Sequence, residues 1–479
     1  MRRFSVYDSM SREVRPFVPI SPPRVGLFVC GLTPQDEAHV GHARTFVFFD
    51  VVARALGRWG YRVLSVQNVT NLDDKVIERA AASGADPLAL SDRNFRAWRR
   101  SSEELGIRTV NYFPYATDYI PEILAQIRGL IERGYAYASA GSVYYTVAKF
   151  AKYGALSGQR TDALRPGARI EVDPAKRAPE DFAVWKAATP GEPAWESPWG
   201  PGRPGWHIED TAITLRLFGP RYDLHGGGLD LIFPHHESEI ALAEGATGEA
   251  PLVNYWMHGG MLTMRGEKMS KSLGNVVPLA DALREHGPMV LRFYYLNAHY
   301  RSPLDFDREK SLAEAREAYA TLSLPADRLA EILGRERPEG SATGEAPAEL
   351  VAAAGALADR LDATLAEDFN TREAIALLFG WSRTLAPRLD RLEQLSDAAL
   401  EELRSPYRWG EEVLGLFVRE PVGSEPLAPV VEATIAARAR ARGRGDYAEA
   451  DRIRAELSAA GIELEDRGGA TRWHPVRRS

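Results

Sequence analysis

The chain has 479 residues, of which 45% are hydrophobic and 26% are charged, and its formal net charge is −7. This composition excludes a disordered chain, and the length predicts roughly three or four domains with a sizeable core. No apolar run approaches the ~20 residues of a membrane span, and the N-terminus lacks the apolar stretch of a secretory signal. We therefore expect a cytoplasmic protein with no membrane partner.

The first 119 residues predict the beginning of an α/β fold. A short apolar run at 25–31 is typical of a buried strand, and residues 38–60 have the apolar spacing of a helix. A second strand-like run at 61–69 and a second helical segment at 71–84 follow. Strand–helix–strand–helix order favours a parallel sheet with crossover helices, in which ligands bind at the carboxyl ends of the strands.

Later changes of composition predict further parts of the chain. A helix, a hairpin-like pair and a Pro-rich stretch interrupt the core, which then resumes with strands that end in glycine. The last third is helical, contains a linker-like stretch at 334–349, and ends in an Arg-rich helix pair. The predicted boundaries are 1–119 and 205–262 for the two halves of the core, 120–204 for the insertion, 263–309 for a lysine-containing loop and stem-contact region, 310–425 for a helical bundle, and 426–479 for a small C-terminal unit.

Two histidines, His39 and His42, open the first long helix, with Gly41 between them. The free N–H groups and the dipole of a helix start favour an anion, and glycine permits a close approach of ligand to backbone. Two imidazoles at this place suit the phosphate oxygens of a nucleotide. The pattern alone also permits a simpler interpretation, in which two polar residues cap the helix.

The chain uses lysine sparingly, since only eight of its 59 basic residues are lysines. Lys268 and Lys271 nevertheless lie within one five-residue stretch, Lys-Met-Ser-Lys-Ser, flanked by glycines. Compact ammonium groups on a flexible loop suit a polyphosphate whose charge must be neutralised as it leaves. A solvated surface loop is the weaker interpretation in so arginine-rich a chain.

These two motifs, about 230 residues apart, together resemble the paired signature of class I aminoacyl-tRNA synthetases. The strings FVCGLTPQDEAHVGHARTFV, VQNVTNLDDKVIERA, GRPGWHIED, YDLHGGGLDLIFPHHESEIA and GEKMSKSLGN resemble the cysteinyl-tRNA synthetase family. EDFNTREAIALLF and GDYAEADRIRAELSAAGIELEDRGGATRW resemble its tRNA-binding region. The resemblance implies a Rossmann-type catalytic core with a connective insertion, a helical bundle and a small C-terminal domain. It also implies an enzyme that joins L-cysteine to tRNA(Cys) with ATP, and we expect a monomer.

The resemblance implies a zinc ion in the amino-acid pocket, held by Cys30, His235, Glu239 and a fourth residue. That fourth ligand is the cysteine of the family's GWHIEC string, and Asp210 stands in its place here. Zinc accepts carboxylate as well as thiolate, so Asp210 keeps one anionic donor. Two interpretations stay open: Asp210 binds zinc in a pocket that still selects cysteine, or it only accepts a hydrogen bond beside a weak or metal-free site.

The single cysteine, Cys30, excludes disulfides and any all-cysteine metal site. A lone thiol is commonly a small buried hydrophobe, and only the resemblance makes Cys30 a metal ligand. A metal would meet a chemical need, because an apolar pocket separates cysteine from serine by only ~1–3 kcal/mol. No His/Asn partner pattern supports a covalent role for this thiol.

The resemblance also implies roles for other residues. The amino-acid pocket is expected to include Thr70, Trp206 and His225. The nucleotide is expected to contact Gly41, Gly227, Asp230 and Lys271. The α-phosphate and the departing pyrophosphate are expected to be stabilised by His39, His42, Lys268 and Lys271, with Mg²⁺ accompanying ATP. His207, His236 and Glu237 are expected to orient the metal ligands without binding the metal.

Two other functions remain open on the sequence. A ligase that activates cysteine for an amino-sugar acceptor would share the core and pocket, but we would expect it to lack the C-terminal extension. A tRNA-binding paralogue without activity is the second, and the aspartate at position 210 prompts it.

Overall fold

The computed structural model describes residues 1–159, 173–264, 266–269, 276–307, 310–335, 343–418, 428–459, 462–467 and 470–475. The chain divides into two compact units, Met1–Phe417 and Val418–Ser479. No helix in these described ranges has the length and apolar character to cross a membrane.

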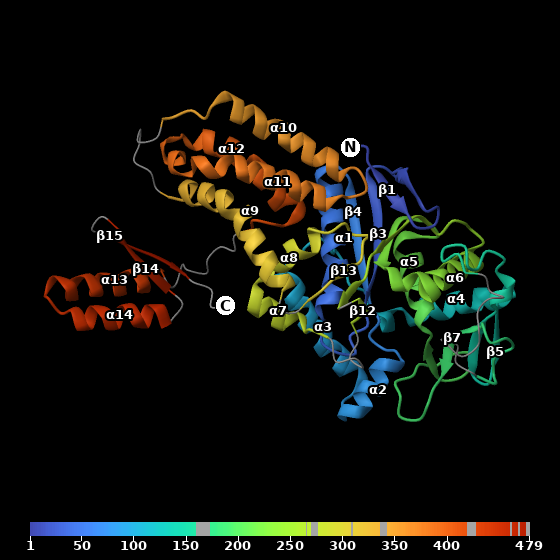
Figure 1. The fold of residues 1–479 in the computed structure, drawn as a ribbon. Coiled ribbons are helices and arrows are strands. Elements are labelled where there is room, and N and C mark those ends of the chain that lie inside the picture. Colours follow the sequence, from blue (N-terminus) through green and yellow to red (C-terminus); the bar gives the residue numbers. More distant parts are fainter. Residues whose placement is uncertain are drawn as a thin grey trace. The chain divides into compact units, whose positions relative to one another are not determined.

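A four-stranded parallel sheet lies at the centre of the first unit (Figure 1). Its strands, in spatial order, are β10 (Val253–Gly259), β9 (Tyr222–Gly228), β3 (Arg24–Leu32) and β4 (Arg62–Val69). Phe28 on β3 is in register with His225 on one side and Val66 on the other. Both faces are covered, which explains why the strands read as continuous apolar runs.

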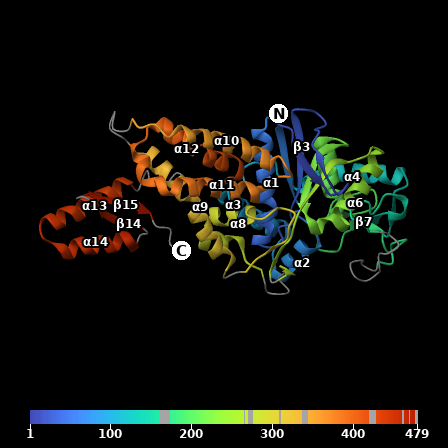
Figure 2. The ribbon, with the colours of Figure 1, turned by 45° about the horizontal axis from the view of Figure 1, so that its top comes forward.

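Helices cover the two faces of this sheet (Figures 1 and 2). One face packs on α1 (Val40–Arg58), and the other packs on α4 (Ile120–Glu132), α5 (Trp206–Phe218) and α6 (Glu237–Thr247). Leu27 and Val29 belong to the hydrophobic core on the α1 side, whereas Phe28 belongs to the core on the α5 and α6 side. Because side chains alternate along a strand, Cys30 faces α5 and α6.

An antiparallel sheet forms the insertion between α4 and α5. Its strands are β5 (Ala136–Ser139), β6 (Ser142–Tyr145), β7 (Phe182–Ala187) and β8 (Gly202–Pro204). Tyr145 and Trp185 from this sheet are fully buried with residues of α4, α5 and α6. The insertion therefore shares its core with the helices of one sheet face.

Short elements complete the part of the first unit around the parallel sheet. The strands are β1 (Ser5–Asp8), β2 (Glu13–Pro16), β11 (Leu262–Met264), β12 (Glu267–Lys268) and β13 (Leu304–Asp305). The helices are α2 (Asp74–Ser83), α3 (Pro87–Glu104), α7 (Leu279–His286) and α8 (Pro288–Leu296). Single turns lie at η1 (Ala116–Tyr119), η2 (Val147–Lys149), η4 (Leu229–Leu231) and η5 (Ile232–His236).

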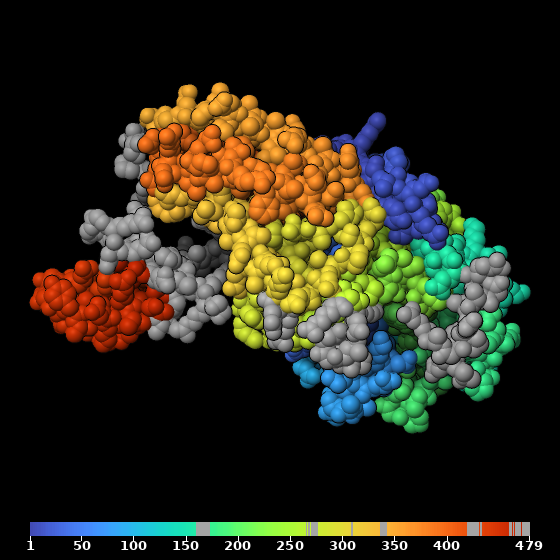
Figure 3. Space-filling view, viewed as in Figure 1, coloured from blue at the N-terminus to red at the C-terminus, as the bar shows by residue number. Residues whose placement is uncertain are grey.

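A helical bundle follows the core. It comprises α9 (Ser311–Leu333), α10 (Ala348–Leu365), α11 (Thr371–Leu385), η7 (Ala386–Gln394), α12 (Asp397–Trp409) and η8 (Gly410–Leu414). The N–H of Ser5 in β1 donates to the carbonyl of Ala366, and the orange bundle adjoins the blue N-terminal hairpin on the surface (Figure 3). The bundle thus packs directly on the N-terminal part of the α/β core.

The second unit is a helix pair followed by a β-hairpin. It contains α13 (Ala428–Gly443), α14 (Tyr447–Ala459), β14 (Ile462–Arg467) and β15 (Ala470–Pro475). Val431, Ile453, Leu457 and Leu464 form its own small core.

Candidate active site

Three polar side chains stand near the carboxyl ends of parallel strands, Cys30 on β3, Asn68 on β4 and His258 on β10, and His225 lies in the middle of β9. All four are buried. The parallel topology brings them to one edge, as expected for the binding edge of such a sheet.

Two helix starts face this edge and bring the other predicted metal ligands. Asp210 lies in α5, and Glu239 lies in the first turn of α6. His235 precedes α6 in η5, a π-helical turn. Its Nε2 lies 3.1 Å from Oε1 of Glu239 and 3.1 Å from Oδ2 of Asp210.

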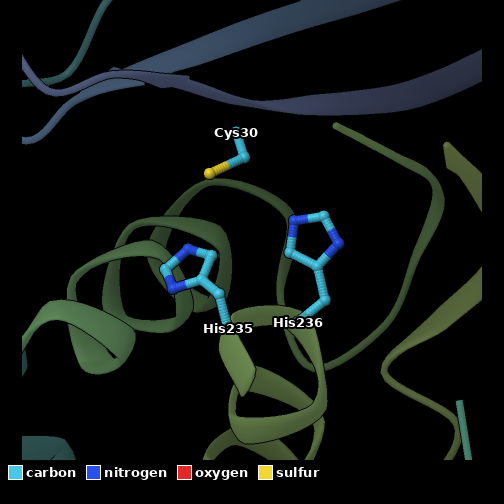
Figure 4. Close-up of side chains that lie close together, drawn as sticks. All are labelled: Cys30, His235 and His236. Atoms are coloured by element: carbon cyan, nitrogen blue, oxygen red, sulfur yellow. The ribbon is translucent and has the colours of Figure 1, made fainter. Parts of the chain in front are cut away.

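Cys30 completes the cluster. Its sulfur lies within 4.8 Å of ring nitrogens of His235 and His236 (Figure 4). Donor atoms of Asp210, His235 and Glu239 lie within 4.8 Å of one another. An ion with bonds of about 2.0–2.3 Å separates its ligand atoms by about 3.3–3.7 Å, so each of these groups is close enough to hold a metal ion. The two groups share His235, which brings Cys30 to the same cluster as the predicted acidic ligands.

The electrostatics of the cluster call for a cation. Burial, and then the charge of Asp210, raise the pKa of Cys30 and of Glu239 well above their ordinary values. In the part of the chain that the structure describes, only histidines lie within ion-pair distance of Asp210 and Glu239. Both carboxylate oxygens of Glu239 are buried without a hydrogen-bond partner. Because uncompensated buried acids are costly, this donor set fits a bound metal ion.

His235 is held from two sides. Its Nδ1 lies 2.9 Å from Nδ1 of His207, so one of these two nitrogens carries the hydrogen. Burial lowers the pKa of His207 well below its ordinary value, which keeps this ring neutral and able to accept. Trp206 stacks on His235 with ring centroids 4.2 Å apart. His207 therefore contacts His235 in a way that suits the predicted orienting role, which stays a prediction, and Nε2 of His235 faces the acidic residues.

The predicted pocket residues surround the same cluster. His225 is fully buried, accepts from or donates to the hydroxyl of Tyr222 (2.6 Å), and lies 3.7 Å from Glu239. Thr70 is buried and is hydrogen-bonded to Glu209. Trp206 is the exposed member, with 37% of its surface accessible. The structure thus brings Thr70, Trp206 and His225 to the cluster, while their contact with an amino acid stays a prediction.

His39 and His42 cap α1 reciprocally. The N–H of Gly41 donates to Nδ1 of His39 (3.1 Å), and the N–H of His39 donates to Nδ1 of His42 (3.3 Å). The two rings stack at 3.7 Å, and a side chain at Gly41 would press on His39 at 3.0 Å. With both Nδ1 atoms accepting, the hydrogens reside on Nε2 in the neutral rings. Capping and phosphate binding are therefore compatible, because capping turns each Nε2–H into a donor.

The lysine motif lies beside this helix start. A Cβ at Gly41 would lie 3.9 Å from the sulfur of Met269, which is buried. After the motif, the carbonyl of Val277 accepts from Val40, and Leu279 donates to Ala38. Lys271 and the side chain of Lys268 lie outside the described residues. Their contact with phosphate stays a prediction.

The glycines of β9 have packing reasons of their own. A Cβ at Gly227 would lie 2.7 Å from the His236 ring, and one at Gly228 would lie 2.7 Å from Oδ1 of Asp230. Asp230 itself is exposed at the end of the strand. The close approach at Gly227 thus involves a protein side chain, and the predicted nucleotide contacts of Gly227 and Asp230 stay untested.

A pocket of about 1180 Å³ adjoins the cluster from the insertion side. Its lining includes Trp206, His207 and Phe233, together with the basic residues Lys186 and Arg203. Both cations bind Asp74 at the start of α2. Trp206 and His207, which contact His235, thus separate the cluster from this pocket.

Sequence reasoning missed Asn68, which bonds to Asp210. It named His236 only as a residue that orients the ligands, whereas His236 lies close enough to Cys30 and His235 to belong to the donor cluster. Nδ1 of His236 lies 2.8 Å from Nε2 of His258. The only available signal for Asn68 was its place at the carboxyl end of a predicted strand next to β3.

Comparison with known proteins agrees with this geometry. A family model described as "tRNA synthetases class I (C) catalytic domain" matches residues 16–317, and one described as "Cysteinyl-tRNA ligase anticodon binding domain" matches residues 424–473. The cysteine–tRNA ligase of Methylococcus capsulatus is 46% identical, covering 98% of this chain and 99% of its own length. That of Laribacter hongkongensis is 45% identical with the same coverage.

Solved structures support the fold. A Mycobacterium tuberculosis methionyl-tRNA synthetase bound by methionyl-adenylate superposes with a TM-score of 0.61 at 18% identity, covering 82% of this chain and 92% of its own. The predicted α/β class with a Rossmann-type core is thereby confirmed. The chain belongs to the cysteine–tRNA ligase family of class I aminoacyl-tRNA synthetases.

Proposed function

We propose that the chain joins L-cysteine to tRNA(Cys) in two steps. The carboxylate of cysteine attacks the α-phosphorus of ATP, which forms cysteinyl-adenylate and releases pyrophosphate. The terminal ribose hydroxyl of the tRNA then attacks the carbonyl carbon of the adenylate, and AMP leaves. The near full-length similarity to curated cysteine–tRNA ligases supports both steps.

The first step depends on positioning and charge. The Nε2–H groups of His39 and His42, together with the N–H groups at the start of α1, would donate to phosphate oxygens. Lys268 and Lys271 would neutralise pyrophosphate as it departs, with Mg²⁺ bound to ATP. These roles require the two motifs to lie close together. Two observations support this: a Cβ at Gly41 would lie 3.9 Å from the sulfur of Met269, and the N–H of Val40 donates to the carbonyl of Val277.

Zinc is the metal that the cluster would hold, through Cys30, Asp210, His235 and Glu239. When bound, it would take the sulfur of cysteine in preference to the hydroxyl of serine, a choice that an apolar pocket makes poorly. The chain's own residues shape the rest of the pocket: Trp206 stacks on His235 at the entrance, and His225 closes the inner side.

The partners follow from the family and the second unit. The match at residues 424–473 supports tRNA as the acceptor and speaks against an amino sugar. We further propose that the chain works as a monomer in the cytoplasm, where tRNA is charged for translation.

The closeness of Asp210, His235 and Glu239, with Cys30 beside His235, is the observation that carries the proposal. Two assays test it together: cysteine-dependent exchange of pyrophosphate into ATP, and transfer of cysteine to tRNA(Cys). We expect both activities, with serine inactive in the first. Exchange without transfer to tRNA would point to the amino-sugar ligase, and absence of both would point to an inactive paralogue.

A further inference from the structure

The aspartate at position 210 can bind a metal in more than one way, whereas a cysteine at this position could not. A thiolate presents one sulfur to a metal, whereas a carboxylate presents two oxygens that can bind singly or together. A buried oxygen that does not bind the metal also needs a hydrogen-bond donor. Asp210 is fully buried, so both of its oxygens must be accounted for within the protein.

Asn68 supplies the donor. Its Nδ2 donates to Oδ1 of Asp210, and more weakly to Oγ1 of Thr70 at 3.3 Å. The other oxygen of Asp210, Oδ2, faces Nε2 of His235 at 3.1 Å. The two oxygens therefore have separate partners: one meets an amide, and the other points to the proposed metal position.

The backbone fixes which way the Asn68 amide points. The N–H of Gly31, which can only donate, lies 2.6 Å from Oδ1 of Asn68, so the NH₂ group must face Asp210. β3 and β4 approach closely here, because a Cβ at Gly31 would lie 1.8 Å from the main-chain oxygen of Asn68. Gly31 follows Cys30, so one asparagine connects the backbone beside one predicted ligand to the side chain of another.

We propose that Asn68 is a positioning residue that holds Asp210 as a single-oxygen ligand, through Oδ2, in place of the family's thiolate. The inference rests on the proposed zinc site. Asn68 is expected to strengthen zinc binding because residue 210 is a carboxylate. A thiolate at 210 has no second donor atom to hold and accepts hydrogen bonds only weakly.

The test is a cycle of four full-length proteins: the natural chain, Asn68→Ala, Asp210→Cys and the double variant. Zinc dissociation constants are measured by competition with a chromophoric chelator. We expect Asn68→Ala to weaken zinc binding about 10- to 100-fold when Asp210 is present, and about threefold or less when Cys is present. The Gly31 N–H loses its partner in both backgrounds, so that cost cancels. An equal loss in both backgrounds, or no loss in either, would overturn the proposal.

Asn71→Ala provides a matched control. Asn71 is also buried and also joins two segments, with Nδ2 donating to Oγ1 of Thr117 at 2.8 Å, but it has no bond to the cluster. We expect its zinc affinity to equal that of the natural chain. A loss like that of Asn68→Ala would show that any buried asparagine here acts through general structure, and would overturn the specific role.

A second readout distinguishes the geometry from simple loss of folding. With Co²⁺ in place of zinc, visible absorption is intense for four-coordinate sites and weak for higher coordination. We expect Asn68→Ala to lower the absorption per bound Co²⁺, because the freed Oδ1 joins the metal, whereas an unchanged spectrum would contradict the proposal. Absence of zinc from the natural chain, with binding by Asp210→Cys, would also overturn it. Cysteine-dependent exchange would then still decide the proposed function separately.

Discussion

Two buried clusters of ionisable side chains in the first unit differ in whether their acidic residues have arginine partners. Where α1 meets α8 and the end of the bundle, Asp50 accepts hydrogen bonds from Arg292 and from Nε of Arg54 at 2.7 Å. Arg292 also donates to the carbonyls of Leu105 and Leu414. In the candidate metal cluster, by contrast, Asp210 and Glu239 have only histidines, and no lysine or arginine, within ion-pair distance among the described residues.

The pKa values express this difference. Burial alone would raise the pKa of Asp50, but Arg292 and Arg54 more than offset it, so the pKa is lowered. The pKa of Glu239 is raised well above its ordinary value, because burial and the charge of Asp210 act in the same direction. Asp50 is therefore compensated within the protein, and removing one of its arginines is expected to be costly, whereas the Glu239 cluster fits a site for a bound cation.

The largest effect is expected from Arg292→Met. This change leaves Asp50 buried with one of its two arginines missing, which should lower the free energy of unfolding by about 3–5 kcal/mol. Denaturant unfolding measures the loss, and zinc affinity should stay unchanged. Arg284→Met is the control, because Arg284 is exposed and pairs only with Asp281 in the same helix. If both variants lose ~1 kcal/mol or less, the Asp50 cluster is not the structural support described here.

Glu239→Gln should have the reverse effects of Arg292→Met: it should lower zinc affinity and leave the stability of the metal-free protein unchanged. We expect zinc affinity and cysteine-dependent exchange to fall by more than about 100-fold, because a ligand is lost. Without metal, the variant should be as stable as the natural chain, because the raised pKa of Glu239 already favours its neutral carboxyl. Chelator competition and denaturant unfolding without zinc measure the two effects. Glu244→Gln, on the same helix and bonded to the N–H of Leu252, is the control. If Glu239→Gln binds zinc as tightly as the natural chain, Glu239 is not a zinc ligand.

A smaller effect, about tenfold on zinc affinity, is expected from His207→Leu. The variant removes the ring that meets Nδ1 of His235 but leaves every proposed ligand in place. His286→Leu controls for loss of a histidine, since His286 contacts Arg316 in another part of the unit. Equal zinc affinity in the two variants would mean that His235 needs no second partner to hold its orientation.

Much of the core could be predicted from the sequence, because local patterns specify it. The apolar run before Cys30 and the helical spacing after His39 give β3 (Arg24–Leu32) and α1 (Val40–Arg58) nearly to the residue. The resemblance implies that His235 and Glu239 share a site, and the structure brings them together, although the turn that holds His235 is π-helical.

What could not be predicted depends on contacts between distant segments. The bond from Asn68 to Asp210 crosses from a strand to a helix 142 residues later, and only the β3–β4 register brings Asn68 beside Gly31. Arg292 meets Asp50 across 242 residues in the same way. Neither residue has a local pattern that indicates a partner, since each is an ordinary member of a strand or helix.

The smallest effect concerns pH. Because the pKa of Asp50 is lower in the folded chain than in the unfolded one, its stabilising contribution is present above the unfolded value of about 3.9 and is lost as pH falls through the folded value. The difference in unfolding free energy between the natural chain and Asp50→Asn should therefore be constant near neutral pH and shrink on acidification. Unfolding curves of both proteins at a series of pH values measure it. A difference independent of pH would mean that Arg292 is held by the shape of residue 50 and the carbonyls of Leu105 and Leu414, and that the charge of Asp50 contributes little.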